Sequence, residues 1–325
     1  MAKTSSAEPD RDGVLADASD KILVWRGEMT SFKSLRTRAL ALSAPPLVWL
    51  TVLLAIPCVL LVGLSFLTRG QYGEIVYVPT FENIKRLAGF GLFGWNANFV
   101  LILLRSFVVA GITTILCIAL AYPLTFHIAT RPGRSRVFWL ILIIIPFWTN
   151  VVVRAYAWLL ILGPHMPPAR LAAWLGLINE GGSLYPGSLA VYLGMVSTFL
   201  PFMALPLYAS VERLNWEIIE AAKDLYGQRL QIFTQAILPQ TRPGLAVGVI
   251  VTFVPAMATF VITDILGGAK TMLIGNLIQQ QFAQAWDWPF GAALSSTLML
   301  MTLICLAIFK RRQDEDPQGS ILNRF

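Results

Sequence analysis

The sequence predicts an all-α membrane protein with six transmembrane helices and both termini in the cytoplasm. Hydrophobic residues make up 56% of the 325 and charged residues only 13%, about half of the ~25% that is usual in soluble domains. No Asp or Glu occurs between Glu82 and Glu180, although a water-facing surface of this length would normally carry acidic groups. Lipid is therefore the expected solvent for most of the chain, which argues against a cytosolic enzyme.

A bilayer core of about 30 Å needs roughly 20 apolar residues in one helix, because only closed backbone hydrogen bonding survives in hydrocarbon. Six windows meet this requirement, and the third is the shortest. They cover residues 44–67, 107–128, 137–153, 189–207, 244–262 and 291–309.

Most of these windows contain proline, which removes a backbone donor and disturbs the helix around it. Kinked helices at mid-depth suit a transporter. The alternative is the ordinary tolerance of membrane helices for proline, and for a single residue the two explanations are equally good. The prolines are Pro57, Pro123, Pro146, Pro201, Pro206 and Pro255.

The orientation follows from the positive charges, because loops rich in Lys and Arg stay in the cytoplasm. With the N-terminus inside, 18 of the 25 Lys and Arg residues fall on the cytoplasmic side. The chain then divides into a cytoplasmic extension (1–43), a membrane domain (44–309) and a cytoplasmic tail (310–325). Segments 68–104 and 163–188 lie outside, and residues 169–178 are expected to form a short helix on the membrane surface.

Catalytic and metal-binding patterns are missing from the sequence. The two histidines, His127 and His165, are assigned to opposite sides of the membrane, and the three cysteines lie far apart in apolar runs. The chain has neither HExxH nor GxSxG. Its net charge of +7 sits in short runs between apolar stretches, which indicates membrane topology and not a nucleic-acid surface.

The cytoplasmic loop 211–243 carries the most informative pattern. Residues 217–225 favour one helix by composition, Gly227 offers a break, and residues 230–238 favour a second helix. Pro239 and Pro243 then precede the next span. Two short helices at an angle would form a projection that another protein can bind.

This loop resembles the EAA loop of type I ABC importer permeases. Glu220-Ala221-Ala222 and Leu238-Pro239 stand at the spacing of that family's pattern. Two positions differ: Tyr226 occupies the family's glycine position with Gly227 one residue later, and Ala236 replaces its isoleucine. Either the turn is displaced by one residue or the angle between the helices differs. The resemblance implies a coupling helix seated in a cytoplasmic ATPase, with coupling residues Glu220, Ala221, Ala222, Asp224, Gly227, Arg229, Leu238 and Pro239.

Further motifs resemble the spermidine/putrescine permease subfamily over residues 44–309. They are Pro146-Phe147-Trp148-Thr149-Asn150, Arg154, Leu200-Pro201-Phe202-Met203 with Pro206-Leu207-Tyr208, Asp264-Ile265-Leu266-Gly267-Gly268-Ala269-Lys270, Ile274-Gly275-Asn276 and Asp287-Trp288-Pro289-Phe290-Gly291. The resemblance implies a bacterial inner-membrane permease for polyamines. It would pair with a homologous second permease, two ATPase subunits and an external binding protein. It implies no cofactor on this chain, since ATP and Mg belong to the ATPase.

Candidate substrate-pathway residues are Trp148, Asn150, Tyr156, Asp264 and Asp287. A carboxylate near hydrocarbon is costly unless it is paired or hydrated, and Asp264 is expected at the outer end of the fifth span. It contacts substrate, is hydrated, or pairs with Lys270 or Arg154. Asp287 caps the sixth helix or touches the binding protein. Asn150 is expected to face the bundle or the partner permease.

Two alternatives to a polyamine permease stay open. One is a related permease for another small organic solute or a metal-chelate, and the other is a stand-alone channel. Seven basic residues against five acidic ones on the external side produce no field that would attract a polycation.

Overall fold

The structure is a computed structural model that describes residues 42–91, 94–95, 97–268 and 271–314. It divides into two units, Met1–Leu60 and Leu61–Phe325. In the first unit the described residues belong to the helix Leu42–Ser65, which ends in the second unit. Most of the predicted extension (1–43) and most of the predicted tail (310–325) lie outside the described residues.

Five helices in the described part of the chain are long and apolar enough to cross a membrane, and a bent pair of helices makes a sixth span if the pair counts as one. The predicted helical membrane fold is therefore confirmed, and the structure matches six spans, with different bounds, when the bent pair is counted as one. The five are Leu42–Ser65, α3 (Asn98–Ala129), α7 (Ser188–Val211), the run Arg229–Ala258 and Trp288–Phe309 within α13 (Trp288–Asp314).

The third span is not the single helix predicted at 137–153. It consists of α4 (Gly133–Trp148) and α5 (Val151–Ile161), which meet at 96°. The chain becomes extended at Thr149, and the Asn150 side chain accepts a hydrogen bond from Val152 N at 2.8 Å, which caps α5. Asn150 is thus an exposed helix cap and not a residue inside a continuous span.

The fifth span also ends earlier than predicted. The run Arg229–Ala258 ends in α10 (Leu238–Ala258), after which Thr259 is extended. Two separate helices follow, α11 (Val261–Gly267) and α12 (Ile274–Ala283). The predicted window 244–262 crossed this break because Val261 and Ile262 are apolar, so Asp264 lies on α11 and not at the end of the fifth span.

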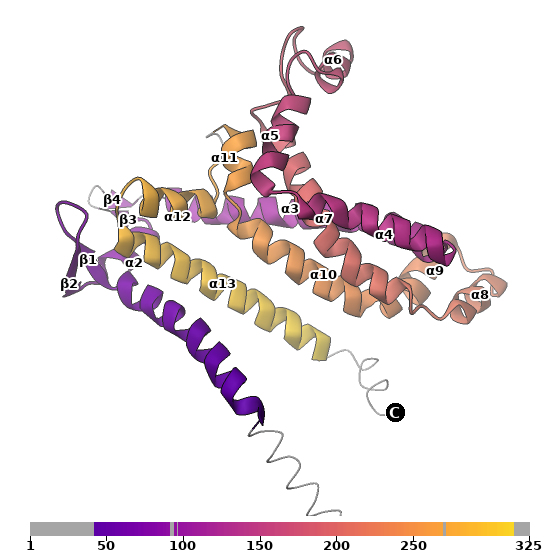
Figure 1. Cartoon of the computed structure of the whole chain (residues 1–325), viewed down its shortest axis with the longest axis horizontal. Coiled ribbons are helices and arrows are strands. Elements are labelled where there is room, and N and C mark those ends of the chain that lie inside the picture. The colour runs from indigo at the N-terminus through magenta and orange to yellow at the C-terminus, as the bar shows by residue number, and fades with distance from the viewer. Residues whose placement is uncertain (1–41, 92–93, 96, 269–270, 315–325) are drawn as a thin grey trace, which may run out of the picture. The chain divides into compact units, whose positions relative to one another are not determined.

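The core of the second unit lies where α7 packs against α3 and α10 (Figure 1). A Cβ added to Gly244 of α10 would overlap Pro206 O and Ser210 Oγ of α7, and one added to Gly248 would lie 2.8 Å from Met203 Sδ. Two small residues four apart let two membrane helices approach closely.

Short elements occupy the segments that were predicted to be external. Strands β1 (Leu67–Arg69) and β2 (Ile75–Pro79) pair antiparallel, with Thr68 opposite Val76. The remaining elements are α2 (Glu82–Leu87), the antiparallel pair β3 (Phe90–Gly91) and β4 (Gly94–Trp95), and α6 (Pro167–Trp174). Helix α6 begins two residues before the predicted 169–178, because proline is favoured in the first helical turn.

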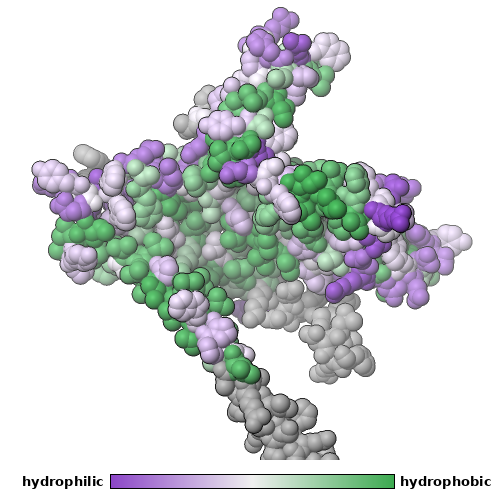
Figure 2. Space-filling model, in the orientation of Figure 1, coloured by the Kyte–Doolittle hydropathy of each residue, from purple (hydrophilic) through white to green (hydrophobic). Residues whose placement is uncertain are grey.

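The surface of the second unit is divided by polarity. Figure 2 shows hydrophobic residues over the middle of the long helices and hydrophilic residues gathered around α8 (Trp216–Asp224) and the start of α4. This banding is the pattern expected when the middle of each helix lies in hydrocarbon.

Candidate functional site

The first candidate site is the α8–α9 hairpin, which consists of α8, the turn 225–228 and α9 (Arg229–Ile232). Figure 1 shows both helices at one end of α10. Asn215 caps α8 by accepting a hydrogen bond from Glu217 N at 3.0 Å. Within α8, Ile219 is buried, while the next residue, Glu220, is exposed.

The prediction of a first helix in this loop is confirmed, and residues 230–238 are helical as predicted, but they do not end before the fifth span. From Arg229 the chain runs through α9, the π-helical segment η1 (Phe233–Ile237) and α10 as one helical run to Ala258. The hairpin therefore consists of one short helix joined by a turn to the N-terminal end of a membrane-length helix. Movement of α8 has a direct covalent path into the fifth span.

The turn of the hairpin stays at the position where the EAA pattern has glycine. Tyr226 has a φ of 58°, in the left-handed region that a side chain rarely adopts. Gly227 N donates to Ala222 O at 3.1 Å and Tyr226 N donates to Lys223 O at 2.9 Å, which is the Schellman arrangement of a helix C-terminus. The turn is thus not displaced by one residue.

Gly227 has a different role from the one its place in the pattern suggests. It does not supply the positive φ; instead, an added Cβ would lie 2.7 Å from Ala222 O. Glycine is required there because the backbone passes close to the end of α8.

The predicted coupling residues lie together at this end of the second unit. Leu238 and Pro239 are half-buried at the base of the hairpin, and the Ala222 side chain is half-buried beneath it. The exposed members form its surface: Glu220, Ala221, Asp224 and Arg229, together with Tyr226, which is 95% exposed.

The second candidate site is a polar pocket of about 240 Å³ between α11 and α12. Asp264, the one charged group among its lining residues, accepts a hydrogen bond from Asn276 Nδ2. Asn276 also donates to Phe260 O at 3.1 Å and accepts from Thr263 Oγ1 at 2.7 Å. The other lining residues are Thr271, Met272, Gln279, Gln280 and Gln284.

Asp264 is exposed, and its described partner is the Asn276 amide. Neither of the basic residues considered from sequence is seen to pair with it. Lys270 lies outside the described residues, and the described hydrogen bond of the Arg154 guanidinium goes to Pro146 O. The carboxylate therefore lines the pocket, and among the described contacts its one side-chain partner is the neutral Asn276 amide, which donates a hydrogen bond.

The aromatic candidates lie on the helices of the bent span. Trp148 ends α4 and is 86% exposed, and Tyr156 on α5 is 54% exposed. Helix α11, which carries Asp264, packs against α5. Asn150 caps α5 and Tyr156 lies within it. The structure therefore places these two candidates on a helix that neighbours α11.

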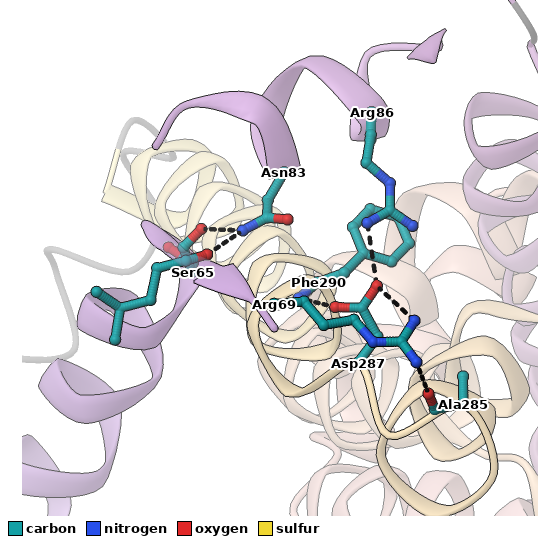
Figure 3. Close-up of polar contacts among 8 residues, drawn as sticks. Ser65, Arg69, Asn83, Arg86, Ala285, Asp287 and Phe290 are labelled. Atoms are coloured by element: carbon teal, nitrogen blue, oxygen red, sulfur yellow. Dashed lines mark hydrogen bonds and ion pairs between the residues drawn. The ribbon is translucent and has the colours of Figure 1, made fainter. Parts of the chain in front are cut away.

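Asp287 belongs to a different cluster, formed with Arg69, Arg86, Ala285 and Phe290 (Figure 3). Its carboxylate lies 3.0 Å from Arg86 Nη1 and 3.9 Å from Arg69 Nη1. It also accepts a hydrogen bond from Phe290 N at 3.2 Å, which confirms the predicted cap of the sixth helix. The Arg86 guanidinium lies 4.1 Å from the centre of the Phe290 ring.

This Asp287 cluster has the properties of a structural contact. Asp287 is 1% exposed, and two guanidinium groups from β1 and α2 compensate its charge. In the same region Asn83 donates to Ser65 O and Leu67 O (Figure 3). The cluster joins the segment 65–87 to the start of α13, so the structure does not bring Asp287 together with Asp264.

Two residues that position these sites had no role assigned from the sequence: Asn276, which was noted only as part of the motif Ile274-Gly275-Asn276, and Gln240. Asn276 holds α11 against α12, and Gln240 joins α10 to the N-cap residue of α8, since its Oε1 accepts from Asn215 N at 3.0 Å. A polar side chain inside or beside an apolar window was the available signal, because such groups are costly in hydrocarbon unless paired.

Comparison with known proteins identifies the class. Residues 120–313 match the family described as binding-protein-dependent transport system inner membrane component, and the chain belongs to this family. It is therefore a multi-pass inner-membrane transport subunit. The expectations of a type I ABC importer permease and of a transport chain instead of an enzyme are confirmed.

Individual relatives share most of the chain's length. It is 37% identical over 263 residues to the spermidine/putrescine transport system permease protein PotB of Escherichia coli (strain K12), covering 81% of this chain and 93% of the relative. It is 34% identical to the PotB of Haemophilus influenzae over 81% of this chain and 90% of the relative. These matches support the predicted subfamily.

A solved structure shares the fold. It is a bacterial ABC transporter involved in the import of the acidic polysaccharide alginate, with a TM-score of 0.63 at 16% identity over 92% of this chain and 98% of that chain.

Proposed function

We propose that the chain is the membrane-spanning permease of an ATP-driven importer of polyamines. The observation that carries this proposal is the 37% identity to a spermidine/putrescine permease over 81% of the chain. In this proposal an external binding protein delivers the solute, a homologous second permease completes the path, and two ATPase subunits bind ATP and Mg. This chain binds no cofactor, and both of its termini lie in the cytoplasm.

The α8–α9 hairpin is the docking element for the ATPase. Its exposed surface presents the small side chain of Ala221 between the charged groups of Glu220, Asp224 and Arg229. A small side chain lets a partner approach closely, and the surrounding charges favour one orientation of the bound partner. The continuous run from Arg229 to Ala258 supports mechanical coupling, because the docked end is part of the fifth span.

The polar pocket beside Asp264 is a binding site for one ammonium group of the solute. A primary ammonium carries three donors and no acceptor. The pocket offers a carboxylate together with the amide oxygens of Gln279, Gln280 and Gln284. Aromatic faces such as Trp148 and Tyr156 on the bent span suit the other ammonium groups by cation–π attraction.

The test is transport by the complete system in proteoliposomes. The chain, its sister permease, its ATPase and the loaded binding protein are reconstituted, and uptake of radiolabelled putrescine and spermidine is followed with and without ATP. ATP-dependent uptake of either polyamine is expected. Uptake of another solute alone would favour the alternative substrate class, and ATP-independent flux through this chain by itself would favour the channel.

Two substitutions separate the parts of the proposal. Glu220→Lys reverses a charge on the docking surface and is expected to abolish ATPase binding in co-purification. Asp264→Asn keeps the size of the side chain and is expected to lower uptake about tenfold or more, because a hydrogen bond to a charged group contributes about 1.5–3 kcal/mol. Glu180→Gln, an exposed carboxyl in the 163–188 segment, is the matched control and should leave uptake unchanged. Equal uptake by Asp264→Asn and the control would remove Asp264 from the pathway.

A further inference from the structure

The base of the α8–α9 hairpin has an unusual backbone. Segment η1 (Phe233–Ile237) is π-helical, and Leu238 N donates to Phe233 O, five residues back. Pro239 follows directly. Because proline has no N–H, the carbonyl four residues before it loses its helical partner, and the wide turn gives the proline ring room. Such π segments weaken the local hydrogen bonding and frequently occur at functional sites.

One side chain connects this segment to the docking helix. Gln240 Nε2 donates to Ala236 O inside η1 at 2.9 Å, and Gln240 Oε1 accepts from Asn215 N at 3.0 Å. Asn215 is the N-cap of α8. We call these three residues the Gln240 bridge. Both polar ends of one amide are used, one on each of the elements that must move together.

The packing around the bridge is apolar and does not fix a direction by itself. Ile219 of α8 and Ala236 of η1 are both buried, and the two elements pack against each other. Apolar contacts are non-directional, whereas a hydrogen bond weakens steeply when its angle changes. The hydrogen bonds of the bridge are therefore the directional contacts between α8 and η1.

The neighbouring end of α7 is held separately. Arg136 Nη1 lies 2.6 Å from Glu212 Oε1, and Arg136 Nη2 donates to Ala129 O at 3.2 Å. This contact joins α7 to α3 and α4 just before α8 begins. With α7 anchored in this way, the bridge is placed to direct motion of α8 toward α10.

We propose that Gln240 is a positioning residue of the transport cycle, which transmits movement of the docked α8 to η1 and the fifth span. This proposal rests on the proposed function, because it requires that α8 binds the ATPase. It goes beyond docking, since it assigns transmission to a residue outside the docking surface and predicts that binding and transmission separate.

The experiment uses the reconstituted complex and compares Gln240→Leu with the wild-type chain. Leucine has a similar size but makes neither hydrogen bond. ATPase binding by co-purification is expected to stay within twofold of wild type. Uptake should fall on the order of tenfold, the effect of losing two net hydrogen bonds, while ATP hydrolysis persists. The measured ratio of ATP hydrolysed to solute transported should therefore rise by a similar factor.

Two further variants guard the interpretation. Gln240→Glu keeps an acceptor for Asn215 N but loses the donor to Ala236 O, so an intermediate ratio is expected, and it carries the test if Gln240→Leu does not fold. Gln235→Leu is the matched control, because Gln235 is exposed on η1 and its side chain makes no described hydrogen bond; its ratio should equal that of wild type.

The outcomes distinguish the two proposals. If the wild-type chain fails to bind an ATPase, the proposed function is wrong. If the wild-type complex transports solute and Gln240→Leu keeps the wild-type ratio, only the bridge is refuted. Loss of ATPase binding in the folded Gln240→Leu variant would also refute it, because the residue would then belong to docking.

Discussion

Alanine substitution at Gly244 should destabilise the protein, and the same substitution at Gly111 should not. A Cβ at Gly244 would overlap Pro206 O and Ser210 Oγ, whereas a Cβ at Gly111 of α3 meets nothing within 4 Å among the described residues. Both glycines are inside helices, where alanine is intrinsically favoured by about 1 kcal/mol. The two substitutions therefore differ in the space that is available for the added Cβ atom.

The magnitude follows from these two terms. Overpacking costs about 1–3 kcal/mol, and the upper end applies at Gly244 because a backbone carbonyl has no rotamer to adopt. Subtracting the helix gain of about 1 kcal/mol leaves a net loss of about 2 kcal/mol. Gly111→Ala should gain up to about 1 kcal/mol, so the variants should differ by about 3 kcal/mol, or roughly 6–12 °C in melting temperature.

The assay is thermal unfolding of the purified full chain in detergent, followed by tryptophan fluorescence. Gly244→Ala is expected to melt below wild type and Gly111→Ala at or above it. If Gly244→Ala melts together with Gly111→Ala, the close approach of α7 and α10 is not a feature of the protein in solution, and the core described above is wrong.

The remaining predictions concern the hairpin turn and the Asp287 cluster. Tyr226→Gly should raise the melting temperature, because a left-handed conformation costs an L-residue about 1–2 kcal/mol, whereas Gly227→Ala should lower it by crowding Ala222 O; the reverse order would place the turn elsewhere. Asp287→Asn keeps the helix cap but removes the charge that faces Arg86, and it should lower the free energy of unfolding by about 1–2 kcal/mol. This is less than the cost of breaking a fully buried ion pair, because the side chains of Arg69 and Arg86 are 43% and 38% exposed. Asp287→Ala should cost about 1 kcal/mol more through loss of the cap, and equal melting of the two variants would show that the cap contributes nothing.

The number of spans was predictable because apolar length is a local property of the sequence. The breaks within the third and fifth spans were not. In the third span the polar pair Thr149-Asn150 is too short to end an apolar window, because Val151 and further apolar residues follow it. After the fifth span Phe260 and Val261 continue the apolar run beyond Thr259. What ends the helices is backbone conformation at Thr149 and Thr259, which is extended in each case.

The same distinction between local and long-range information applies to the candidate sites. The hairpin was recognisable because its motif and its turn are contiguous in sequence, and the cap at Asp287 follows from a rule that spans only three residues. The contacts between Asp287 and Arg86 join residues 201 positions apart. The bridge through Gln240 likewise depends on how α8 returns to α10. Contacts of this kind arise from tertiary packing, which one sequence does not determine.

The break after α10 explains why a polar pocket exists beside Asp264. Phe260 directly precedes α11, and its carbonyl accepts hydrogen bonds from Asp264 N within α11, from Thr263 Oγ1 and from Asn276 Nδ2 of α12. Gly275 allows α12 to approach that closely, because an added Cβ would overlap Ala258 O. Asn276 therefore joins α12 to the start of α11 through Phe260 O and also donates to the Asp264 carboxylate. The side chain that holds the two short helices together is thus part of the wall of the pocket.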